Sequence, residues 1–228
     1  DPVREILVEL IDFDGLKGRG AIPLFIAATN LRDGGRRIFT NAELSPDVLI
    51  ASACLPTLHH AVKLDDGHYW DGGFSANPPL LPLLEQCDGA EILLVHVNPM
   101  TEPDVPMTAR EIHSRLNNIV FNGPVKRELE MIAWLRSAIE RAGGRDSPLG
   151  KRLAQLKIHS IGADELMRRL GTASKLNPDW RFVTYLKQAG EQAAERWLED
   201  VFGAAVEPLD TTAPARGGAV APFRAPSR

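Results

Sequence analysis

The sequence lacks three features that would each assign it to a large class of proteins. It has two cysteines, Cys54 and Cys87, which are too few for a disulfide framework, and we expect both to be buried free thiols in a reducing compartment. It has no excess of basic residues, since its net charge is −4, and this argues against nucleic acid as a partner. It also has no apolar run long enough to span a membrane and no visible signal peptide. These absences favour a cytoplasmic protein, with peripheral contact to a membrane or lipid surface left open.

The composition is otherwise that of a globular protein, with 44% hydrophobic and 25% charged residues. A length of 228 residues suits one large domain or a domain with an extension. Strand-like and helix-like segments alternate, which predicts an α/β layered domain with a largely parallel sheet. We expect strands at residues 24–28, 36–40, 59–64, 67–70, 92–97 and 156–161, and helices at residues 1–10, 45–54, 108–121, 124–142, 164–170, 180–189 and 191–201.

The most informative segment is residues 70–79, which read Trp-Asp-Gly-Gly-Phe-Ser-Ala-Asn-Pro-Pro. Asp71 is followed by Gly72 and Gly73, which allow the backbone to turn tightly around the carboxylate and leave room for a group to approach it. Asn77 precedes two prolines, which is typical of the capped start of a helix. The pattern therefore predicts a carboxylate on a sharp loop between a strand and a helix, where a rigid scaffold presents it to a cleft.

This segment resembles the Asp-Gly-Gly/Ala block of the patatin-like phospholipases, which are lipid acyl hydrolases. Other segments resemble further parts of that family: its strand before a basic hairpin, its helix ending in proline, and its next core strand. These segments are Pro23–Asn30, Ala51–Pro56 and Glu91–Pro99. The resemblance covers about residues 1–100, and the helical remainder, with residues 174–177 and 179–198, resembles the C-terminal extension of one bacterial subgroup.

The resemblance implies a three-layer α/β/α patatin-like sheet domain, incomplete at its N-terminus, with a helical C-terminal extension. Residues 1–100 would be the C-terminal part of the catalytic domain, 101–205 the remaining strand and the extension, and 206–228, rich in Ala, Pro, Gly and Arg, a disordered tail. It further implies a serine esterase or phospholipase that uses a Ser–Asp dyad, with Asp71 as the base and Asp71, Gly72 and Gly73 as the motif. The implied substrate is a lipid or another ester, and no cofactor or metal is required.

The family also carries a Gly-rich oxyanion loop and a Gly-x-Ser-x-Gly nucleophile elbow before the Asp block, and neither occurs in this sequence. The nearest string, Gly73–Asn77, lacks the second glycine. We therefore expect a separate N-terminal segment to supply the nucleophile. The alternative is a non-catalytic remnant of the fold that acts as a binding or scaffold protein.

Two other kinds of chemistry remain open. His96 and His159 lie in strand-like runs and are rival general bases, since a serine followed by Asp71 and then a histidine would follow the chain order of an α/β-hydrolase triad. A backbone-bonded structural histidine is the alternative at both positions. Ser52 and Ser75 lack an elbow and are expected to be structural. A metal site is weakly suggested by a cluster of potential ligands around one hairpin: His59, His60, Asp65, Asp66, His68 and Asp71.

Overall fold

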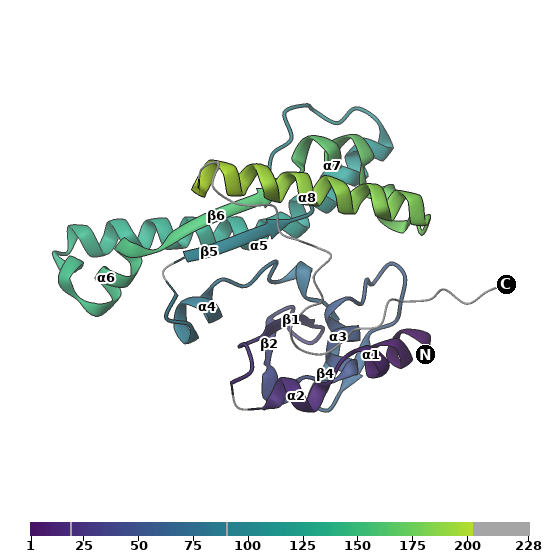
Figure 1. The fold of residues 1–228 in the computed structure, drawn as a ribbon, viewed down its shortest axis with the longest axis horizontal. Coiled ribbons are helices and arrows are strands. Elements are labelled where there is room, and N and C mark those ends of the chain that lie inside the picture. The colour runs from purple at the N-terminus through teal and green to yellow at the C-terminus, as the bar shows by residue number, and fades with distance from the viewer. Residues whose placement is uncertain (19, 90, 203–228) are drawn as a thin grey trace.

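A computed structural model of the protein describes residues 1–18, 20–89 and 91–202 (Figure 1). The strands are β1 (Phe25–Asn30), β2 (Arg36–Thr40), β3 (Val62–Leu64), β4 (Gly67–Asp71), β5 (Glu91–His96) and β6 (Lys157–Gly162). The α-helices are α1 (Pro2–Leu10), α2 (Phe13–Lys17), α3 (Pro46–Ser52), α4 (Leu81–Gln86), α5 (Ala109–Arg141), α6 (Pro148–Gln155), α7 (Asp164–Leu170) and α8 (Trp180–Phe202). Short 3-10 helices are η1 (Asn41–Glu43), η2 (Gly72–Phe74), η3 (Gly144–Asp146) and η4 (Thr172–Leu176).

The N-terminal part is a four-stranded antiparallel sheet in the order β2-β1-β4-β3. Gly34, at φ 70°, supplies the left-handed conformation that the turn between β1 and β2 requires. Helix α3 covers the sheet, and its first turn is capped by the Ser45 hydroxyl, which accepts a hydrogen bond from the Val48 amide. Ala28, Phe39 and Tyr69 from the sheet pack with Val48 and other α3 residues into one buried cluster.

The C-terminal part is built around a two-stranded parallel sheet of β5 and β6. The long helix α5 packs on one face, where Ile92 and Leu94 join Val125 and Ile132 in a second buried cluster. Helix α8 runs along the other face of β6 (Figure 1), with Trp197 in edge-to-face contact with His159. In the described part of the chain, β5 pairs with β6 alone, so its other edge is open.

The mixed α/β class and the helical C-terminal part are confirmed. The strand pairing differs from the expected single, largely parallel sheet, because the described strands form two separate sheets and the larger one is antiparallel. Short hairpins connect β1 to β2 and β3 to β4, and such connections can join only antiparallel strands. Residues 206–228, expected to be a disordered tail, lie outside the described residues.

Three predicted helix boundaries are wrong. Residues 109–141 form one helix, α5, although Asn122-Gly123-Pro124 was expected to separate two helices. Helices were also expected at residues 180–189 and 191–201, but Gly190 lies inside the continuous α8. Burial explains α5, because residues on both sides of Pro124 are packed against the rest of the protein and this packing outweighs the lost backbone hydrogen bond. Asn77 does not cap a helix: its side chain donates to the Phe121 carbonyl at 2.9 Å, and α4 begins at Leu81.

Glu128 of α5 takes over the capping of α4. Its carboxylate accepts hydrogen bonds from the backbone amides of Leu80, at 2.6 Å, and Leu81, at 3.3 Å. The same carboxylate pairs with Arg36 of β2. Glu128 is 8% exposed, and a buried carboxylate is tolerated only with such partners. This one residue therefore links the N-terminal sheet, α4 and α5. None of the described helices contains a stretch that is long and apolar enough to cross a bilayer.

Candidate functional site

Asp71 is the last residue of β4, and three hydrogen bonds hold it, two at its backbone and one at its side chain. Its amide donates to the Cys54 carbonyl at 2.8 Å, and its carbonyl accepts from the Thr29 hydroxyl at 2.7 Å. Its side chain accepts from the Gly73 amide at 2.7 Å and so caps η2. The strand-then-loop position predicted for this carboxylate is confirmed, although a 3-10 turn rather than a longer helix follows directly.

Gly72 and Gly73 are required for close packing, not for an unusual backbone conformation, since neither has a positive φ. A Cβ on Gly72 would collide with the backbone of Ala27 in β1, and a Cβ on Gly73 would collide with the Phe121 ring of α5. The space beside these two glycines is thus occupied by β1 and α5. This packing holds the Asp71 loop rigidly between the N-terminal sheet and α5.

Burial disfavours the ionised form of Asp71, and two other contacts favour it. Burial raises the pKa of the Asp71 carboxyl, while the hydrogen bond from Gly73 and the positive charge of Lys175 lower it. Cys54 is affected in turn: burial raises the pKa of its thiol, and the negative charge of Asp71 raises it further. A carboxylate whose pKa is raised by burial is a better proton acceptor near neutral pH, as a general base must be.

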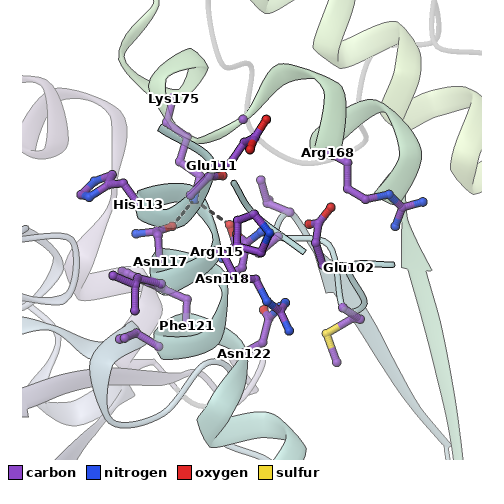
Figure 2. A pocket seen from close by; sticks show the side chains of 18 of the residues that line it. Glu102, Glu111, His113, Arg115, Asn117, Asn118, Phe121, Asn122, Arg168 and Lys175 are labelled. Atoms are coloured by element: carbon purple, nitrogen blue, oxygen red, sulfur yellow. Dashed lines mark hydrogen bonds between the residues drawn. The ribbon is translucent and has the colours of Figure 1, made fainter. Parts of the chain in front are cut away.

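Asp71 lines a cavity of about 1770 Å³ that extends from the β4–η2 turn along α5. Part of its lining is apolar, with side chains from β5, the following loop and α5, including Val95, Val97, Met100 and Leu116. Figure 2 shows the polar part of the wall, where Asn117, Phe121 and Asn122 follow one another along α5 and Lys175 reaches toward Asn117. A cavity lined by both apolar and charged side chains suits an amphiphilic ligand.

Sequence reasoning identified Asp71 but missed Lys175, Asn98 and Asn117. The Lys175 nitrogen donates to the side-chain oxygens of Asn98, at 2.6 Å, and Asn117, at 3.0 Å. These residues lie on three different segments. Asn98 and Lys175 fall within segments noted for their family resemblance, residues 91–99 and 174–177, but nothing local marks either residue as part of a site. Their association depends on the packing of η4 against α5, which sequence spacing does not reveal.

The rival base His96 lines the same cavity but is bonded elsewhere. Its Nε2 lies 2.9 Å from Oδ1 of Asp164, and its Nδ1 lies 3.1 Å from the Ser160 hydroxyl. Gly162 makes this placement possible, because a Cβ there would collide with the imidazole ring. The second rival, His159, packs against Trp197 instead. Among the described hydrogen bonds, none joins either histidine to Asp71.

The remaining candidates do not assemble into a site. No three His, Cys, Asp or Glu side chains come together as a metal-binding group among residues 1–18, 20–89 and 91–202. Asp66 of the hairpin pairs with Arg37 instead. The Ser75 hydroxyl lies 2.8 Å from the Thr29 hydroxyl, and Ser52 is the last residue of α3.

Comparison with known proteins gives one positive finding. Residues 1–84 match the patatin-like phospholipase family, and the matched region includes Asp71, Gly72 and Gly73. No curated protein matches the chain. The family resemblance of the N-terminal part is therefore confirmed, and residues 85–228 lie outside the match.

Proposed function

We propose that this chain carries the catalytic base of a lipid acyl hydrolase, a carboxylic ester hydrolase with a Ser–Asp dyad, because residues 1–84 match the patatin-like phospholipase family. The observation that carries the proposal is the position of Asp71. Its carboxylate is held on a rigid turn at the wall of the cavity, and it lies within the region that matches the family.

In this proposal Asp71 accepts the proton of a serine hydroxyl directly, without an intervening imidazole. The serine oxygen attacks the ester carbonyl carbon, Asp71 passes the proton to the leaving alkoxide, the alcohol departs, and an acyl-enzyme forms. Asp71, again ionised, then takes a proton from water, whose oxygen attacks the acyl carbon. Asp71 returns this proton to the serine oxygen as the bond to the acyl group breaks and the fatty acid is released. Backbone N–H groups stabilise the oxyanion in both steps, and apolar side chains of the cavity lining hold the acyl chain.

The serine and the oxyanion loop are proposed to come from a segment outside these 228 residues. Strand β5 supports this proposal, because its edge away from β6 is open and Leu93, Val95 and Val97 are 44%, 72% and 65% exposed on and just after it. An open strand edge beside exposed apolar side chains is a surface that another segment can cover.

Covalent labelling of the complete protein with a fluorophosphonate tests the proposal. We expect one serine to be labelled, in a Gly-x-Ser-x-Gly sequence, and we expect the Asp71→Asn variant to be labelled at least about 100-fold more slowly, because general bases contribute that much or more. A matched Asp33→Asn variant should be labelled at the wild-type rate, since Asp33 caps an exposed turn in the same way. If no serine is labelled in the folded protein, the hydrolase assignment fails and the non-catalytic scaffold is favoured.

A further inference from the structure

Lys175 lines the cavity, and two hydrogen bonds hold its ammonium group there without neutralising its charge. Its two hydrogen-bond acceptors, Asn98 and Asn117, are uncharged carboxamides. Asn98 is 8% exposed and so provides a rigid anchor for the ammonium group. In the part of the chain that the structure describes, no carboxylate forms an ion pair with Lys175. Two neutral acceptors therefore hold a positive charge in place and leave that charge available to act on a more distant group.

The Phe121 ring connects Lys175 to the Asp71 turn. The Lys175 nitrogen lies 5.7 Å from the centre of this ring, close enough for a cation–π contact. The same ring packs against Phe74, with the ring centres 5.0 Å apart, and fills the space beside Gly73. Gly73 in turn donates its amide hydrogen to Asp71. The cation and the carboxylate thus line the same cavity and are linked through one aromatic ring.

We infer that Lys175 is a positioning residue for the proposed hydrolysis, whose ammonium charge keeps the Asp71 carboxylate ionised so that it can accept the serine proton. This inference rests on the proposed function, because it assigns a partner to the proposed base. It also explains why a lysine is held by two amide oxygens and not by a carboxylate: a closer anion would cancel the charge that Asp71 requires.

Asp71 and Lys175 shift each other's pKa in opposite directions, because their charges are opposite. Burial raises the pKa of Asp71, and Lys175 lowers it. Burial lowers the pKa of Lys175, and Asp71 raises it. Without the cation, the buried carboxylate would bind a proton at a higher pH and would stop acting as a base over that range.

Other ionisable groups also face this part of the molecule, from the segment after α3, from β5, from α5 and from α7. Further groups come from the loop after β5. Among the described residues, the full set is Cys54, His96, Glu102, Asp104, Arg110, Glu111, His113, Arg115, Glu165, Arg168 and Arg169. A pH profile alone would combine their effects with that of Asp71. The test therefore requires direct observation of the Asp71 carboxyl as well as kinetics.

The kinetic experiment measures kcat/KM against pH for the complete protein with a soluble ester. Lys175→Met should move the acidic limb to higher pH by about half to one unit, which lowers kcat/KM about three- to tenfold on that side. Lys175→Arg, which keeps the charge, should leave the limb in place. The matched control is Lys126→Met. Lys126, on α5, likewise donates to a neutral oxygen, the Met100 carbonyl at 2.7 Å. This variant should leave the acidic limb unchanged.

The direct experiment follows the carboxyl carbon of Asp71 by NMR in the same variants. Lys175→Met should raise the pH of its titration midpoint by the same amount as the kinetic limb, and Asp71→Asn should lower the titration midpoint of Lys175. If the midpoint of Asp71 is unchanged in folded Lys175→Met, the inference is overturned and Lys175 is only a structural link. If the midpoint moves but Asp71→Asn retains full turnover, the coupling is real and the proposed function of Asp71 fails instead.

Discussion

At the scale of single residues, Asp71 combines tight hydrogen bonding with an environment that disfavours its charge. The Gly73 amide and the Lys175 ammonium stabilise the ionised form, yet burial outweighs them and the pKa of the carboxyl is raised. Functional groups are commonly held in such unfavourable surroundings at a cost to stability. Replacement of the carboxylate by a neutral group of the same shape should therefore stabilise the fold.

Asp71→Asn should raise the free energy of unfolding, and this gain should depend on pH. The pKa of Asp71 is raised in the folded state above its ordinary value of 3.8, so the cost of its charge appears as the pH rises above about that value and levels off above the folded-state pKa. Urea unfolding should show a gain on the order of 1 kcal/mol at pH 7 and almost none near pH 3. Asp33→Asn is the control at an exposed turn. A gain that is equal at both pH values would contradict the account.

The identity of Asp71 could be predicted from sequence because its neighbours form a compact, recognisable motif. Lys175 could not be predicted, since its role depends on Asn98 and Asn117, which are remote in sequence and ordinary in type. Gly72 and Gly73 were expected to allow a tight turn and to leave room beside the carboxylate, but the structure shows a different need for them. Their missing side chains serve contacts with Ala27 and Phe121, and these partners cannot be read from the Asp-Gly-Gly string.

At the scale of elements, the β4–η2 turn is held between β1 and α5. Gly72→Ala should destabilise the protein by about 2–3 kcal/mol, because its Cβ would meet the Ala27 backbone, which cannot move without distorting β1. Gly73→Ala should cost less, since the Phe121 ring can rotate away. Gly190→Ala, in open space on α8, should stabilise the helix by about 0.5–1 kcal/mol. Chemical denaturation of the three variants checks this order, and equal costs at Gly72 and Gly73 would contradict it.

The interior of α5 holds the two halves of the molecule together through Glu128. Glu128→Ala should lower the free energy of unfolding by about 2–4 kcal/mol, because it leaves the Leu80 and Leu81 amides and Arg36 without their partner. Glu128→Gln should cost less, since the amide oxygen can still accept from the α4 amides. The exposed Glu130 on the same helix is the control, and Glu130→Ala should change stability by no more than about 0.5 kcal/mol. A similar effect at both positions in urea unfolding would argue against the capping role.

Local signals predicted most of the elements, and tertiary packing caused the errors. The Ser45 cap and the turn at Gly34 are short-range features, and both lie where the sequence places them. Pro124 and Asn77 carry equally strong local signals that packing overrides. Pro124 is buried within α5, and the Asn77 side chain donates a hydrogen bond to the Phe121 carbonyl of α5 instead of capping α4. Local propensity is a weak guide where a segment is buried against a distant partner.

At the scale of the whole molecule, the open edge of β5 is the feature that most affects behaviour in solution. The 228-residue chain alone should self-associate, because Leu93, Val95 and Val97 are exposed beside unpaired strand groups. Val95→Lys should reduce this association in sedimentation velocity, since a charge on an edge strand opposes pairing. Val183→Lys on α8, where the valine is 42% exposed, is the control and should have little effect. If the wild-type chain is instead a monodisperse monomer, the open edge of β5 is stable in water without a covering segment, and the prediction is wrong.

The central claim is that the Asp71 carboxylate is the base of an ester hydrolase, and the hydrolysis of a short p-nitrophenyl ester by the complete protein tests it most directly. Asp71→Asn should lower kcat/KM by at least about 100-fold while the variant remains folded, because the amide keeps the shape but cannot accept the proton. His96→Gln and His159→Gln should stay within about tenfold of the wild type, since loss of a triad histidine would cost several orders of magnitude. Near-normal turnover by folded Asp71→Asn, or a collapse of activity in either histidine variant, would contradict the account.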